Sequence, residues 1–165
     1  MTEQLRKSLE RLSQVAPKLN QATDRATSII NRVEEFLSNS GVGMPASASL
    51  GHREVVVRKD EETGGQTTGL ELSAVSYDRD RNTGRYRLLY QTWREDGYGN
   101  LMSEEEDVVL AQAPRHMKLE AVGALPELLQ AVAESAERAM TTADANAEAV
   151  EKLLEGLDST GAKKK

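Results

Sequence analysis

The chain contains no cysteine among its 165 residues. That absence excludes disulfide bonds, thiolate zinc sites and a cysteine nucleophile, and it suits a reducing cytosol. Basic charge is also in deficit, since 27 acidic residues outnumber 21 basic residues and leave a net charge of −6. A net negative charge disfavours general binding to nucleic acid or to anionic membranes.

Long apolar runs are missing as well. No segment is apolar enough to span a bilayer, and residues 1–12 lack the apolar core of a signal peptide. We therefore expect a cytoplasmic protein that does not bind a membrane. The content of 38% hydrophobic and 29% charged residues is typical of a folded domain. We predict one domain over residues 1–160, followed by a basic, frayed tail over residues 161–165.

A long amphipathic helix is predicted over residues 2–38. Its residues step by four and three positions along one face, with Thr23 as the one polar member, through Leu5, Leu9, Leu12, Ala16, Leu19, Thr23, Ala26, Ile30, Val33 and Leu37. Beside them lies a second series at seven-residue spacing, formed by Val15, Ala22, Ile29 and Phe36. Together they form a stripe that is wide enough to need cover from other protein. Pro17 does not break this register, so we predict a kink there.

A second long helix is predicted over residues 124–157. Its apolar seam again steps by three and four positions, with Asn146 as the one polar interruption, through Val122, Leu125, Leu129, Val132, Ala136, Ala139, Ala143, Asn146, Val150, Leu153 and Leu157. The seam is widened by a flanking series of Ala133, Met140, Ala147 and Leu154. Residues 114–123 also alternate like a strand, but we favour a helical turn that leads into this helix.

Between the two helices, residues 52–112 change to the two-residue period of a β-sheet. We expect four strands joined by turns rich in Gly, Asn and Asp, at residues 52–59, 70–77, 85–94 and 105–112. Short joins between such strands predict an antiparallel meander. The predicted fold is therefore α+β, a four-stranded antiparallel meander flanked by long N- and C-terminal helices in the order α-β4-α.

The spacing of Asp78, Asp80 and Asn82 is similar to the start of a calcium-binding loop. Such a loop needs glycine at its sixth position and a bidentate glutamate at its twelfth. This sequence has Thr83 and Leu89 at those positions. We therefore predict a hairpin turn instead of a calcium site.

The sequence leaves a metal-dependent enzyme open as the second alternative function, through the acidic run at residues 104–107 with His52 or His116. Alternate side chains of a strand point to opposite faces, so at most two of these carboxylates converge. Neither histidine belongs to an HExxH motif or stands beside a recognisable nucleophile. We predict a solvated, edge-protecting acidic run, no catalytic residue, no metal site and no cofactor.

The predicted sheet contains every tyrosine and the only tryptophan, with arginines between them. Aromatic rings edged by arginine can stack single-stranded bases. The first alternative function is therefore ligand or single-stranded nucleic-acid binding through Tyr77, Tyr86, Arg87, Tyr90 and Trp93. Neighbouring carboxylates cancel much of the positive charge, and tyrosine is favoured in strands in any case, so nucleic acid is not the preferred partner.

The function that the sequence favours is a non-catalytic, cytoplasmic protein-interaction module, an oligomeric adaptor or a small chaperone-like or regulatory factor. Both predicted helices are longer than a four-stranded sheet can cover, so their apolar faces need another protein surface. We expect a homodimer and a protein partner that the sequence does not identify. The predicted contact residues are Leu19, Ile30, Val33, Leu37, Leu129, Met140, Val150, Leu153 and Leu157.

Overall fold

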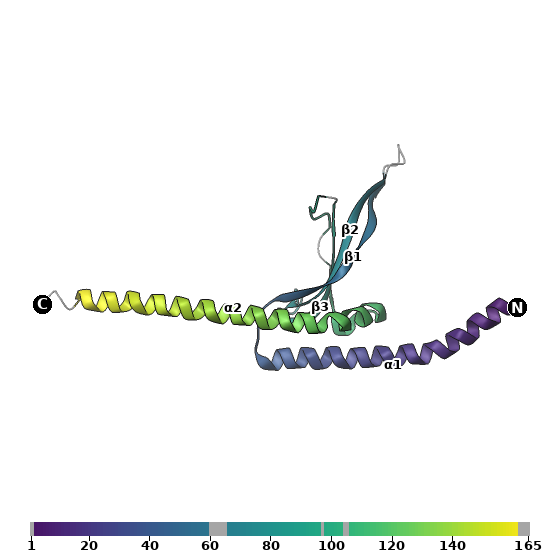
Figure 1. Cartoon of the computed structure of the whole chain (residues 1–165), viewed down its shortest axis with the longest axis horizontal. Helices are drawn as coiled ribbons and strands as arrows, with labels where there is room; N and C mark the ends of the chain where they lie inside the picture. Colours follow the sequence, from purple (N-terminus) through teal and green to yellow (C-terminus); the bar gives the residue numbers. More distant parts are fainter. Residues whose placement is uncertain (1, 60–65, 97, 104–105, 162–165) are drawn as a thin grey trace.

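The computed structural model describes residues 2–59, 66–96, 98–103 and 106–161 (Figure 1). Its elements follow in the order α1 (Glu3–Ser40), β1 (Ala46–Lys59), β2 (Gln66–Arg79), β3 (Tyr86–Glu95), β4 (Glu106–Val109), the short 3-10 helix η1 (Leu110–Gln112) and α2 (Arg115–Gly161). The four strands form one antiparallel sheet in the order β1-β2-β3-β4. The predicted α+β fold with the order α-β4-α is confirmed.

α1 extends past its predicted C-terminal end at residue 38, and α2 extends past both of its predicted ends at residues 124 and 157. α1 ends at Ser40, where Gly41 takes a left-handed φ of 68° and its N–H donates to the carbonyl oxygen of Ser38 at 3.3 Å. α2 already begins at Arg115, so residues 115–123 are helical. The reason is that the buried residues Ala121, Leu125, Leu128 and Val132 recur at steps of four and three, which is a helical and not a strand-like period.

Pro17 lies inside α1, and the N-terminal part of that helix bends away from the line of the rest (Figure 1). Proline has no N–H to donate to the preceding turn, and its ring crowds the carbonyl four residues earlier, so helices bend at such a position. This agrees with the kink predicted from the sequence. The helix continues through the proline, and its apolar face therefore stays on one element.

The sheet is displaced toward the N-terminus relative to the predicted range of 52–112. β1 begins at Ala46, and its register with β2 shifts between Ser49 and Gly51, where a φ of 128° at the glycine marks a bulge. At the other edge β4 ends at Val109. The next residues form η1 because Leu110 turns into the core, where it is fully buried.

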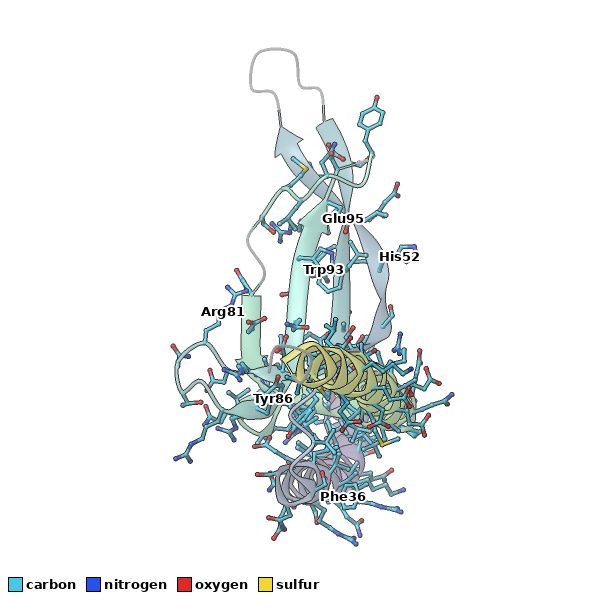
Figure 2. The ribbon with its side chains drawn as sticks, turned by 90° about the vertical axis from the view of Figure 1, so that its left-hand side faces the viewer. Phe36, His52, Arg81, Tyr86, Trp93 and Glu95 are labelled. Carbon is cyan, nitrogen blue, oxygen red and sulfur yellow. The ribbon has the colours of Figure 1, made fainter. Side chains whose placement is uncertain are left out.

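Viewed along the helices, the sheet, α2 and α1 are stacked (Figure 2). The largest fully buried side chains come from all of these elements and are Ile30, Val75, Tyr77, Leu88, Leu89, Leu110 and Leu128. Ile30 is fully buried in this core, and Leu129 is partly buried against it. An ion pair between Glu34 Oε1 and Arg87 Nε, 2.8 Å apart, joins α1 to β3.

α1 and α2 run side by side in the same direction, but they are staggered (Figure 1). At the start of α2, Arg115 Nη2 donates to Asn20 Oδ1 at 2.6 Å. Further along, Ser135 Oγ donates to the carbonyl oxygen of Pro45, which lies beyond the end of α1, at 3.4 Å. The first part of α1 and the last part of α2 therefore extend past the region of overlap in opposite directions.

Candidate functional site

The first part of α1 presents an uncovered apolar face. We call residues 3–19 the N-terminal overhang, and every side chain in it is exposed. Its large apolar side chains are between 37% and 63% exposed and are Leu5, Leu9, Leu12, Val15 and Leu19. They continue, with the same stepping, the face that buries Ala26, Ile30 and Leu37 further along the helix. The same face of one helix is thus covered in one half and bare in the other.

The last part of α2 repeats this arrangement at the opposite end of the molecule. We call residues 140–154 the C-terminal overhang, and all of its side chains are exposed. Its large apolar members, between 54% and 68% exposed, are Met140, Val150, Leu153 and Leu154. They continue the face that buries Ala121, Leu125, Leu128 and Val132 against the rest of the chain.

The two overhangs carry opposite net charge. In the N-terminal overhang the charged residues are Arg6, Lys7, Arg11 and Lys18 against Glu3 and Glu10, an excess of two positive charges. In the C-terminal overhang they are Asp144, Glu148 and Glu151 against Lys152, an excess of two negative charges. The ion pairs within each overhang, such as Lys152 Nζ to Glu148 Oε2 at 4.0 Å, are fully solvated and contribute little.

Five of these charges make no ion pair within the described part of the chain, namely Glu10, Arg11 and Lys18 of α1 and Asp144 and Glu151 of α2. The two basic residues are seven positions apart on one flank of the apolar face of α1. The two acidic residues are also seven positions apart, on one flank of the apolar face of α2. Charges at heptad spacing beside an apolar seam are typical of helices that form salt bridges to a partner helix.

The predicted contact residues divide into two groups. Ile30 and Leu37 are buried in the chain's own core, and Val33 and Leu129 are partly buried against that core, so the fold itself already uses all four. The exposed members of the predicted set are Leu19, Met140, Val150 and Leu153. The side chain of Leu157 lies outside the described residues.

Sequence reasoning missed part of the exposed face, namely Leu5, Leu9, Leu12, Val15 and Leu154. Their stepping was visible, but the predicted contact set did not include them. Helix length had already pointed to these ends, because helices that outrun the sheet are left uncovered there, but it was not used to choose the contact residues.

The aromatic and arginine face offers little for base stacking. Tyr77 and Tyr90 are only 2% and 6% exposed, and burial raises the pKa of both phenols. The ring centroids of Tyr77 and Tyr86 are 5.3 Å apart. The Arg79 guanidinium carbon lies over the Tyr86 ring, 5.4 Å from its centroid. Arg87 pairs with Glu34 at 2.8 Å, so these groups are already used within the fold.

The structure brings His52 and His116 to one pocket of about 290 Å³, which is also lined by Glu71, Tyr90 and Glu120. The Tyr90 hydroxyl donates to Glu120 Oε2 at 2.8 Å. Hydrogen bonds from Arg94 and then Arg53 lower the pKa of Glu71 and hold it as a carboxylate. Each carboxylate of the pocket is therefore already engaged.

The described part of the acidic run, Glu106 and Asp107, does not line the pocket that contains His52 and His116. Asp107 accepts from Gln91 Nε2 at 3.1 Å and pairs with Arg81 Nε at 3.1 Å, while residues 104 and 105 lie outside the described residues. Among residues 2–59, 66–96, 98–103 and 106–161, no three His, Asp or Glu side chains form a group suited to a metal ion.

The predicted hairpin at residues 78–84 is confirmed as the turn between β2 and β3. Asp80 closes it with both carboxylate oxygens, since Oδ1 accepts the Asn82 N–H at 3.0 Å and Oδ2 accepts the Thr83 hydroxyl at 2.7 Å. Its carbonyl oxygen accepts the Gly84 N–H at 2.7 Å. The aspartate that suggested a calcium ligand is thus a structural part of the turn.

Comparison with protein-family models, with curated proteins and with solved structures finds no match to this chain. Within the described residues, none of the helices has the combination of length and apolar character that crossing a membrane requires. The two overhangs are the candidate site, because within the described residues they hold most of the large apolar side chains that the fold leaves exposed.

Proposed function

We propose that this protein is a non-catalytic, cytoplasmic protein-interaction module whose two overhangs bind helices of other protein, in the first place those of a second copy of the chain. The observation that carries the proposal is the continuation of each buried helix face into a row of exposed leucine, valine and methionine side chains. Contiguous apolar rows of this kind on a protein surface mark interaction sites.

The free energy gained by covering the apolar rows can be compared with the cost of association. Covering a fully exposed leucine or valine contributes about 1.5–3 kcal/mol, and the side chains of the overhangs are roughly half exposed, so each contributes about 1 kcal/mol. Association itself costs about 4–15 kcal/mol. The large side chains of one overhang together supply about 4–5 kcal/mol, at the low end of that cost, so covering both overhangs together gives the more stable complex.

The proposal is tested by light scattering coupled to size exclusion at micromolar protein. We expect a mass of about twice 18.1 kDa, because the apolar rows need cover. Leu12→Glu is expected to shift the mass toward the monomer, since it places a charge in the row. Gln14→Glu, which adds the same charge on the other side of α1, is the matched control and should leave the mass unchanged.

A wild-type mass that stays at 18.1 kDa as the protein concentration rises would contradict self-association. Loss of the larger mass in both variants would instead assign the effect to net charge and not to the apolar row. Circular dichroism of each variant checks that the helices remain folded.

A further inference from the structure

The overhangs lie at opposite ends of the helical layer because α1 and α2 run in the same direction with a stagger (Figure 1). At about 1.5 Å per residue they are also similar in length, about 25 Å for residues 3–19 and about 22 Å for residues 140–154. A partner that is to cover both must therefore offer two helical surfaces, one at each end.

Three pairings between two copies are conceivable, and charge separates them. Packing α1 on α1, or α2 on α2, would place two overhangs of the same net charge side by side. Packing the N-terminal overhang of one copy on the C-terminal overhang of the other places an excess of two positive charges beside an excess of two negative charges. Complementary charge across an interface selects the correct partner and register.

Symmetry favours the same pairing. A two-fold axis perpendicular to the helices exchanges the two ends of the molecule, so each N-terminal overhang meets the C-terminal overhang of the other copy. Both contacts form at once, and no apolar row is left open at either end. A simple translation would also bring unlike overhangs together, but it would leave one of each uncovered and produce an open chain, whereas closed two-fold dimers are the commonest assemblies.

We propose that two copies form a reciprocal dimer in which the N-terminal overhang of each packs antiparallel on the C-terminal overhang of the other. This inference rests on the proposed function, and it adds which surfaces meet. Arg11 and Lys18 flank one apolar row and Asp144 and Glu151 flank the other, at the same seven-residue spacing. These four side chains supply the interhelical salt bridges of the dimer.

The test reverses the flanking charges. One variant carries Arg11→Glu with Lys18→Glu, a second carries Asp144→Lys with Glu151→Lys, and a third carries all four changes. Each two-site variant faces like charge in the reciprocal dimer, so we expect its dimer Kd at low salt to rise by about tenfold or more. The four-site variant restores opposite charges, and its Kd should return to within about threefold of the wild type.

Self-pairing of α1 or of α2 gives a different result. Reversal then replaces one like-charge pair by another, so the two-site variants would keep the wild-type Kd and the four-site variant would rescue nothing. That pattern would overturn the reciprocal dimer while leaving self-association intact. A wild-type protein that is monomeric would overturn the proposed function itself, so the two failures are distinguishable.

A second measurement uses the absence of natural cysteine. Copies carrying Leu9→Cys are mixed with copies carrying Met140→Cys or Val150→Cys and are then oxidised. The reciprocal dimer predicts a disulfide-linked dimer in at least one mixture and in none of the single variants, because equivalent overhangs lie at opposite ends of the assembly. A crosslink in a single variant, or none in either mixture, would overturn the arrangement.

Discussion

Asp80 shows how one carboxylate can determine the shape of a turn. Its side chain is buried beneath the turn, and the Asn82 N–H and the Thr83 hydroxyl both donate to it. These hydrogen bonds stabilise the charged form, so the pKa of Asp80 is lowered, with the Asn82 N–H as the largest cause. A group whose pKa falls on folding makes stability depend on pH.

The sign of that dependence gives the first prediction. Because the folded pKa lies below the ordinary value of 3.8, the contribution of Asp80 is fully present above that value and is lost as the pH falls through it toward the folded pKa. Asp80→Asn is expected to lower the melting temperature at neutral pH and to flatten its decline as the pH falls below about 4. Thermal unfolding followed by circular dichroism from neutral pH to below this value measures both effects.

The matched control is Asp24→Asn on α1. Asp24 is exposed, and within the described residues its carboxylate accepts no hydrogen bond and makes no ion pair. That variant should follow the wild-type curve. An Asp80→Asn curve parallel to the wild type at every pH would mean that the turn does not depend on the charged carboxylate.

At the scale of the element, α1 is one amphipathic helix with two environments. Ile30 is fully buried under α2 and the sheet, whereas Leu12 on the same face is 63% exposed. What differs between them is their position relative to the start of α2, which meets α1 at Asn20. The covered half of the helix supports the domain, and the bare half is free for a partner.

The second prediction compares two large side chains within the covered half of α1. Ile30→Ala removes a fully buried side chain and should cost about 2–5 kcal/mol in the free energy of unfolding. Phe36→Ala removes a larger side chain that is 64% exposed, and it should cost less than about 1 kcal/mol. Urea unfolding measures both values. Equal losses at the two sites would mean that the burial of α1 differs from the one described.

The periodicity of the sequence indicates which side chains share a face, but it does not indicate which turns of that face are covered. Ile30 and Leu12 follow the same stepping, and only the stagger between α1 and α2 distinguishes them. That stagger is held by contacts such as Arg115 to Asn20, which are 95 positions apart in the chain. The pocket shared by His52 and His116 was hidden for the same reason, since it depends on how the β1 edge meets the start of α2.

Element types were predictable because the period changes clearly from helix to sheet and back. The ends of the helices and strands were harder to predict from the sequence, since they depend on tertiary contacts. Residues 46–50 join β1 through pairing with β2, and Leu110 leaves the line of β4 to enter the core. Residues 46–50 are mostly small, and Leu110 ends an apolar run, so the local sequence does not indicate that the first segment is a strand or that the second leaves one.

On the scale of the whole molecule, the hydrophobic core occupies only the region where the helices overlap and the sheet packs against them (Figures 1 and 2). The overhangs lie outside it. Helical segments of such length are marginal in water without packing, and most helical stability in proteins comes from burial of an apolar face. Under the proposed function the ends of α1 and α2 therefore depend on a partner more than the centre does, and we expect folding of the ends to be coupled to association.

That coupling gives the last prediction, a melting temperature that rises with protein concentration. Association stabilises the folded state by mass action, and a tenfold rise in concentration adds about 0.7 kcal/mol per chain in a dimer. For a chain of this size such a change shifts the melting temperature by about 1–3 °C. Differential scanning calorimetry from micromolar to hundreds of micromolar protein measures the shift.

Leu12→Glu should abolish the dependence of the melting temperature on concentration and Gln14→Glu should preserve it, because only Leu12→Glu places a charge within the apolar row of α1. A dimer whose melting temperature does not change with protein concentration would show that the overhangs fold fully without their partner.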